Sequence, residues 1–246
     1  MTLLNCGDKY ELHQLTDNEL ITFTRQQNSA AWHGLLTAEQ YVEREGVLHK
    51  SKITSLKKNK LYVFMLTEKN NMDVRVSLIE LLVRNLWKYT SDKSGKVRRQ
   101  DVLAGCIGGV YTYPEARGKG VAKIMVDLLV ERAKKDIVGP DGFLFLYLEI
   151  GEYYTRCGFK SFEVPLVQID LPTIKNSNSS KYQVKYIKYH DFDEELELYN
   201  RQVDEKYRAL TENDGKTRVS LAPMLDLVDW FHLRAKFIAA KLFHLD

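Results

Sequence analysis

The sequence predicts an α/β protein, because segments with strand patterning alternate with segments of helical spacing. KLYVFMLT (60–67) and VSLIELLVRNLW (76–87) are rich in β-branched and aromatic residues, and the polar turn 68–73 joins them. Further along, a strand at 101–113, an amphipathic helix and the apolar segment FLFLYLE (143–149) follow one another. These two groups of segments predict a sheet with helices packed on it.

The N-terminal part contributes one strand and two helices. KYELHQLT (9–16) predicts the first strand. Apolar residues recur with helical spacing over 17–27 and 38–46, and Thr37 is a suitable N-cap for the second helix.

The strand 101–113 is unusual because it contains Gly105, Gly108 and Gly109 and is followed by Pro114. Glycine weakens a strand, and it often marks a bulge or a place where another group approaches the backbone closely. The helix that follows runs to about residue 135. Its apolar residues recur every three or four positions, as in a helix with one buried face: Val121, Ile124, Met125, Leu128, Leu129 and Ala133.

The segment after this helix completes the predicted sheet. GPDG (139–142) reads as a turn, and FLFLYLE is apolar throughout, which predicts a central strand. A short helix over 151–157 and a last strand over 159–171 follow.

The C-terminal part has a different composition. TIKNSNSSK (173–181) is polar and predicts a linker. A short strand (182–188) and an acidic helix (191–210) come next. The long helix at about 221–243 is apolar almost all round, so we expect it to be buried. Since the chain stops shortly after it, we expect a truncated second domain.

Composition and charge exclude several classes of protein. The chain has 246 residues, 44% of them hydrophobic, and a net charge of +3, which argues against a nucleic-acid partner. The basic run of Lys57, Lys58 and Lys60 is short enough to be a solvated turn. No signal peptide is visible, and no apolar run is long enough to cross a bilayer, so we expect no membrane partner.

The cysteines indicate a reduced compartment. Cys6, Cys106 and Cys157 are odd in number and widely spaced, and none lies near histidines as in a metal site. We therefore expect no metal, and a cytoplasmic setting, with the nucleus as an alternative.

The stretch YPEARGKGVAKIM (113–125) predicts an anion site. A strand, a glycine turn and a helix N-terminus together present unpaired N–H groups and the positive end of a helix dipole. Gly118 and Gly120 let the backbone approach an anion, and charge comes from Arg117, Lys119 and Lys123. The spacing is neither GxxxxGK[ST] nor GxGxxG. A plain basic turn is the alternative reading.

The context of this turn resembles the GNAT superfamily of acetyl-CoA-dependent N-acetyltransferases. The family signature [Q/R]-x-x-G-x-[G/A] is matched by Arg117, Gly120 and Ala122. A second family element, aromatic–Tyr–x–x–x–Gly–Phe, follows one helix and one strand later and is matched by Tyr153, Tyr154, Gly158 and Phe159. The resemblance covers about residues 8–171. It implies the GNAT fold, a central mixed, mostly antiparallel sheet flanked by helices, with a partial second domain after it.

Several segments are similar to the fungal lysine N-epsilon-acetyltransferases: WHGLLTAEQYVERE, LLVRNLWKY, GGVYTYPEARGKGVAK, EIGEYYTRCGF and DWFHLRAKFI. In those proteins a GNAT domain precedes a second domain. The resemblance therefore implies a catalytic, acetyl-CoA-binding domain over 1–172, a linker over 173–181 and the start of a C-terminal domain over 182–246.

The GNAT resemblance implies how acetyl-CoA is held. The backbone N–H groups of the turn and helix start would bind its pyrophosphate, at Arg117, Gly118, Lys119, Gly120, Val121 and Ala122. The strand would splay from its neighbour after Gly109, so that the pantetheine arm pairs with Val110 and Thr112. One of these N–H groups would bind the thioester oxygen. Two residues depart from the family pattern: Tyr147 replaces a common asparagine, and Glu115 adjoins the phosphate turn.

Transfer to a lysine amine requires a general base, because that amine has a reference pKa of ~10.4. Strand 76–87 alternates, and Glu80 shares its face with Leu78, Leu82 and Arg84. A carboxyl on a largely apolar face has a raised pKa, which suits a base. The alternative is a structural ion pair between Glu80 and Arg84.

The leaving thiolate requires a general acid, and the resemblance implies Tyr154 in that role. The alternative is a structural role, in which Tyr154 is buried and its hydroxyl only forms a hydrogen bond. Cys157 lies in the same motif, but the lack of a neighbouring histidine favours a core residue over a nucleophile. His33 and His49 could act as bases, although surface roles are favoured.

The resemblance implies transfer of the acetyl group to free L-lysine by direct attack in a ternary complex. A carboxylate clamp would then be expected from an arginine: Arg84, Arg201, Arg218 or Arg234. Two alternatives stay open. The acceptor could be another amine, such as a protein lysine, a polyamine or an aminoglycoside, or the chain could be a catalytically silent acetyl-CoA-binding module.

Overall fold

A six-stranded sheet organises the computed structural model, which describes residues 9–55, 60–148, 151–163, 187–188 and 191–245. Its main strand order is β1-β2-β3-β4-β5, and β6 pairs with β3. All pairs are antiparallel except β4 with β5. The expected α/β class, with a mixed and mostly antiparallel sheet, is confirmed. The strands are β1 (Tyr10–Leu15), β2 (Lys60–Glu68), β3 (Asn71–Ser91), β4 (Val97–Thr112), β5 (Phe143–Leu146) and β6 (Arg218–Leu221).

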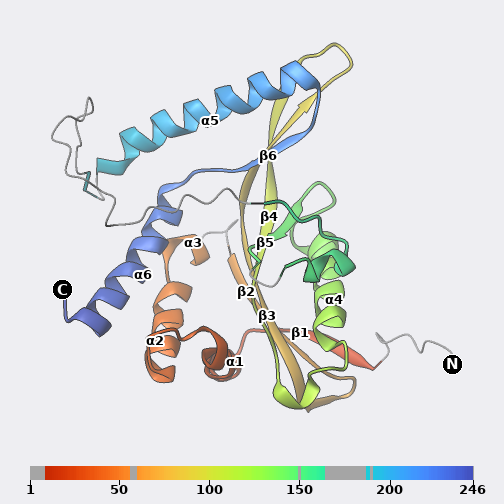
Figure 1. Cartoon of the computed structure of the whole chain (residues 1–246), viewed down its shortest axis with the longest axis vertical. Coiled ribbons are helices and arrows are strands. Elements are labelled where there is room, and N and C mark those ends of the chain that lie inside the picture. Colours follow the sequence, from red (N-terminus) through yellow and green to blue (C-terminus); the bar gives the residue numbers. More distant parts are fainter. Residues whose placement is uncertain (1–8, 56–59, 149–150, 164–186, 189–190, 246) are drawn as a thin grey trace.

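Helices cover both faces of the sheet (Figure 1). One layer holds α1 (Asn18–Trp32), α2 (Ala38–His49), α3 (Lys52–Ser55) and α6 (Leu225–Phe243), and the opposite face carries α4 (Val121–Asp136). Thr37 caps α2 as predicted. Its hydroxyl accepts from the Gln40 N–H, and the Gln40 side chain accepts from the Thr37 N–H, which forms a capping box.

The main core lies between the sheet and α4. Apolar side chains on the inward face of α4 pack against alternate residues of β3, because the helix and the strand each present one apolar face there. The fully or almost fully buried members include Ile79, Leu81, Val83, Val121, Met125, Val126, Leu129 and Ala133.

The C-terminal part is attached to the far half of the long β3–β4 hairpin. Helix α5 (Phe192–Asp214) lies across this half (Figure 1). The Tyr89 hydroxyl donates to Asp204 at 3.1 Å, Arg99 pairs with Asp204 at 3.0 Å, and Tyr207 stacks on Tyr89. β6, which the sequence did not predict, pairs with β3 beside these contacts.

Two predictions about burial were wrong. β5 lies at the end of the described sheet and is half-buried, because it is short and pairs only with β4 there. No residue of α6 is buried, and Phe231 is 54% exposed. The helix contacts α2, α3 and α5, which leave the rest of its apolar circumference uncovered.

Two boundaries also differ from the predictions. The predicted helix 221–243 begins at Leu225, because residues before it form β6 and a connecting segment. Residues 159–163 form no strand, and the rest of the predicted strand 159–171 lies outside the described residues. The same is true of the linker 173–181 and of most of the strand predicted at 182–188.

Leu129→Ala should destabilise the fold strongly. Leu129 is completely buried between α4 and the sheet, so the change removes packing and leaves a cavity that costs about 2–5 kcal/mol. Chemical denaturation of both proteins measures the difference. Lys134→Ala, on the exposed side of the same helix, is the control and should change stability little. An equal loss in both variants would contradict this position of the core.

Candidate active site

A bulge in the β3–β4 ladder creates the centre of the site. The register shifts between Leu78 and Glu80, so that Glu80 lies opposite Gly108. Gly109 follows with a φ of +57°, a conformation that glycine adopts without strain. A Cβ there would lie 3.2 Å from the Asn28 Nδ2 and 3.3 Å from the Glu80 Cγ. The absent side chain therefore lets α1 and Glu80 approach the β4 backbone.

The outer edge of β4 becomes free near the same point. β5 pairs only with Ala104–Ile107 of β4. From Gly108 onward, that edge has no strand partner among the described residues. Val110 and Thr112, which the sequence analysis expects to pair with the pantetheine arm, lie in this free segment. The Thr112 carbonyl also accepts a hydrogen bond from the Arg117 Nε at 3.1 Å.

The turn before α4 presents backbone N–H groups. Gly118 and Gly120 both have positive φ, and Gly120 is the N-cap, with no side-chain cap. Among the described residues, the N–H groups of 118–122 donate to no backbone carbonyl. This series of free donors at a helix N-terminus suits the pyrophosphate of a nucleotide.

The three cations of the turn are engaged elsewhere. Arg117 folds back onto β4, with its guanidinium 5.6 Å from the centre of the Tyr111 ring. The Lys119 Nζ donates to the Glu115 carbonyl at 2.8 Å, and Lys123 pairs with Asp127. The backbone of the turn, rather than these side chains, therefore offers the free donors.

Tyr154 lies on the α4 side of the sheet, in the short 3-10 helix η3 (Tyr153–Cys157). It is buried in the main core, where it meets Tyr153 and Phe159 edge-on and shares its cluster with Val110. Its hydroxyl bonds to no other described residue. Burial raises the pKa of this hydroxyl above its ordinary value, so it stays protonated at neutral pH and can donate a proton.

Cys157 has the properties of a core residue. Burial, together with the nearby Asp127, raises the pKa of its thiol. A nucleophilic cysteine requires the opposite shift. His33 is exposed, and its Nδ1 contacts the Leu36 carbonyl at 2.7 Å.

Glu80 lies on the opposite face, under α1 and α2. Burial, the largest cause, and the Glu45 charge together raise the pKa of its carboxyl to about 7, although Arg25 opposes both effects. Glu80 forms no ion pair with Arg84 among the described residues. The Arg84 guanidinium instead lies 5.2 Å from the centre of the Phe145 ring. The carboxyl therefore titrates near neutral pH, as a general base must.

The surroundings of Glu80 include residues that the sequence analysis missed or placed at the surface. The Arg25 guanidinium contacts the Nδ1 of His49, which is half-buried, and burial lowers the pKa of that imidazole. The Arg25 Nε and the Asn28 Oδ1 are buried without a partner in the described part of the chain. Arg25 and Asn28 are three residues apart, so they share the inward face of α1. Polar residues on an inward helix face were the signal that could have revealed them.

The four arginines named as candidates for a carboxylate clamp lie in different surroundings. Arg84 packs over an aromatic ring, and Arg218 pairs with Asp214 at 2.6 Å. Arg201 and Arg234 are exposed on α5 and α6. Tyr147, at the position of the family asparagine, is 71% exposed. No cluster that could hold a metal ion, and no helix able to cross a membrane, occurs among the described residues.

Two family models match parts of this chain. Residues 87–159 match the acetyltransferase (GNAT) family model, and residues 168–246 match the LYC1 GNAT-like C-terminal domain. An uncharacterized protein of Saccharomyces cerevisiae is 29% identical over 272 residues, which cover 98% of this chain and 68% of the relative.

Solved acetyltransferases are more distant. Glucosamine-6-phosphate N-acetyltransferase of Arabidopsis thaliana has 14% identity and a TM-score of 0.41, over 65% of this chain and 97% of its own. A predicted acetyltransferase of Clostridium acetobutylicum, crystallised with acetyl-CoA, has 16% identity and a TM-score of 0.39, over 66% and 96%. The two family matches show a GNAT acetyltransferase domain over residues 87–159, followed by a LYC1 GNAT-like C-terminal domain over residues 168–246.

Proposed function

We propose that this enzyme transfers the acetyl group of acetyl-CoA to the side-chain amine of free L-lysine, by direct attack in a ternary complex. The observation that carries the proposal is the position of Glu80, a carboxyl with a pKa of about 7 beside the open backbone of Gly109. Tyr154 lies on the other face of the sheet. A base and an acid are thus available on opposite sides of β4.

The backbone of β4 and of the turn before α4 would hold acetyl-CoA. The N–H groups of 118–122 suit the pyrophosphate, and the free edge at Val110 and Thr112 suits the amides of the pantetheine arm. Arg117 contributes by fixing the turn to β4 through the Thr112 carbonyl.

Glu80 takes a proton from the lysine ammonium, and the neutral amine attacks the acetyl carbonyl carbon. The Val110 N–H stabilises the negative charge that grows on the carbonyl oxygen. The tetrahedral intermediate then breaks its C–S bond, and Tyr154 donates its proton to the leaving sulfur. The attacking nitrogen releases its surplus proton to water, from which Tyr154 is reprotonated. Burial favours the neutral form of each group, so Glu80 holds its proton after accepting it and Tyr154 keeps its proton until the transfer.

Free L-lysine is proposed because segments along the chain resemble the fungal lysine N-epsilon-acetyltransferases, whose GNAT domain precedes a second domain. The matched C-terminal model agrees with that organisation. We propose the corresponding division of the chain, with a catalytic domain over 1–172 and a C-terminal domain from 182. The free thiols of Cys106 and Cys157 support a reduced compartment, the cytoplasm or the nucleus.

Release of CoA from acetyl-CoA tests the function directly. Free L-lysine is compared with spermidine and a histone-like peptide, and mass spectrometry locates the acetyl group. The proposal expects N-epsilon-acetyllysine as the main product. If another amine is acetylated faster, that amine replaces L-lysine as the proposed substrate. If acetyl-CoA binds but no amine is acetylated, the chain is a catalytically silent binding module.

Glu80→Gln should lower kcat by about 10²–10⁴-fold. In the wild type, activity should rise with pH through about 7, because only the ionised carboxylate accepts a proton. Glu45 and Arg25 shift this midpoint in opposite directions. The variant should lose this dependence, as measured by kcat/KM from pH 5.5 to 9. Glu131→Gln, on the exposed side of α4, is the control. A variant that retains the wild-type pH profile would exclude Glu80 as the base.

Tyr154→Phe should lower kcat while acetyl-CoA binding stays close to that of the wild type. The change removes the proton donor but keeps the ring packed against Tyr153 and Phe159. Steady-state kinetics and calorimetric titration with CoA measure the two effects separately. Unchanged kcat would leave Tyr154 with a packing role only.

Gly120→Ala should weaken acetyl-CoA binding. The φ of Gly120 is +73°, so a Cβ costs about 1 kcal/mol and shifts the N–H groups of the turn. Gly95→Ala is a matched control, because Gly95 has a φ of +82° and equally open surroundings in the distant β3–β4 turn. Both variants should lose similar stability, but only Gly120→Ala should raise the Kd for CoA. Equal Kd values would argue against a pyrophosphate on this turn.

A further inference from the structure

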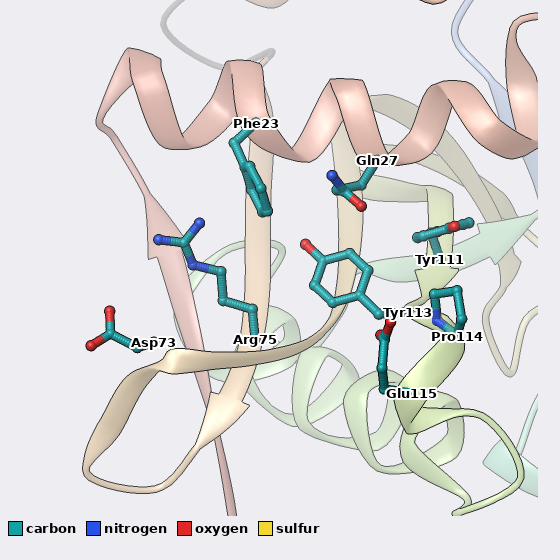
Figure 2. A pocket seen from close by; sticks show the side chains of 8 residues that line it. All are labelled: Phe23, Gln27, Asp73, Arg75, Tyr111, Tyr113, Pro114 and Glu115. Carbon is teal, nitrogen blue, oxygen red and sulfur yellow. The ribbon is translucent and has the colours of Figure 1, made fainter.

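A pocket of about 410 Å³ opens between α1 and the ends of β3 and β4 (Figure 2). α1 forms one wall, and the β3 and β4 strands with the segment after β4 form the others. Its lining residues are Phe23, Gln27, Asp73, Arg75, Tyr111, Tyr113, Pro114 and Glu115. None of them was singled out by the sequence analysis except Pro114 and Glu115, which were noted for other reasons.

Two hydrogen-bond donors in this pocket have no acceptor in the part of the chain that the structure describes. Tyr113 is only 6% exposed, and its hydroxyl is buried without a partner among the described residues. The Arg75 Nε is likewise buried and unpaired, and the Arg75 guanidinium lies 4.6 Å from the centre of the Phe23 ring. Figure 2 shows the Tyr113 hydroxyl turned into the space between α1 and Arg75. A carboxylate would satisfy both donors, and arginine is the side chain that binds carboxylates best.

The remaining residues that line the pocket indicate which other chemical groups the ligand carries. Asp73 and Glu115 bring two negative charges against the single positive charge of Arg75, which disfavours a phosphate and favours a ligand that also carries ammonium groups. Phe23, Tyr111 and Pro114 provide apolar surface for methylene groups. These features fit an amino acid with a basic side chain.

Two of the residues that line the pocket are close in sequence to the site around Gly109. Tyr111, which lines it, is two residues after Gly109 on β4, a rise of about 7 Å. Gln27, on the α1 side, precedes Asn28, the residue next to Gly109. A long, flexible amino-acid side chain can span such a distance between the pocket and the bulge.

We propose that this pocket holds the α-carboxylate of the acceptor amino acid, with Arg75 and Tyr113 as its binding residues. The inference rests on the proposed function and adds the origin of its specificity. Arg75 takes the role that the sequence analysis sought among four other arginines. Amines without a carboxylate, such as polyamines, cannot use this contact and should be poor acceptors.

Paired kinetics with L-lysine and cadaverine test the proposal, because cadaverine is lysine without its carboxylate. In the wild type, kcat/KM should be higher for L-lysine. Arg75→Gln should lower kcat/KM for L-lysine roughly ten- to a hundred-fold, through a higher KM. The kcat/KM for cadaverine and the KM for acetyl-CoA should stay unchanged. Tyr113→Phe should act in the same direction with a smaller loss. Arg132→Gln, an exposed arginine on α4, is the control and should change neither substrate.

A parallel fall for both amines, or no change for L-lysine, would overturn the proposal. Calorimetric titration of L-lysine into the CoA-bound protein measures binding to the pocket without turnover. It therefore tests the pocket even in the case that no amine is acetylated. Binding that Arg75→Gln abolishes and cadaverine does not reproduce supports the pocket. Absence of binding, or equal binding by Arg75→Gln, refutes it. Thermal unfolding of each variant separates these effects from a folding defect.

Discussion

The close approach of α1 and Glu80 to the backbone of Gly109 is the contact on which the rest of the site depends. It requires a residue without a Cβ, in a left-handed conformation, at a bulge between two long paired strands. The bulge has two effects. It brings a carboxyl beside an open stretch of backbone, and it coincides with the point where β5 stops pairing with β4. One local irregularity therefore gives both a polar centre and a free strand edge.

The sheet then separates two chemical environments. On the α4 face, Tyr154 is packed among aromatic rings, and burial keeps its hydroxyl protonated. On the other face, Glu80 lies among charged residues of α1 and α2, where burial and Glu45 outweigh Arg25. Burial raises the pKa of both groups. The pKa of the carboxyl thereby approaches neutral pH, whereas the pKa of the phenol moves further above it. The same physical effect therefore prepares one group to accept a proton and the other to donate one.

Local patterns in the sequence predicted much of this arrangement. The strands β1 to β5, the N-cap at Thr37, the glycine turn and the start of α4 follow from short-range rules, and the structure contains them. The strand β6 and the exposure of α6 depend on contacts between distant segments, which hydrophobic periodicity does not encode. For the same reason the sequence placed Arg84 beside Glu80, whereas the tertiary packing brings Arg25 there from α1. The roles of the individual site residues stay predictions.

The most direct test of the account is a crystal structure of the protein with CoA. The account predicts the sulfur at the free edge of β4 beside Gly109, with the Tyr154 hydroxyl within hydrogen-bond reach. It also predicts the pyrophosphate on the N–H groups of 118–122. CoA bound with its sulfur away from the β4 bulge, or with its pyrophosphate off the turn before α4, would contradict the central role of this contact.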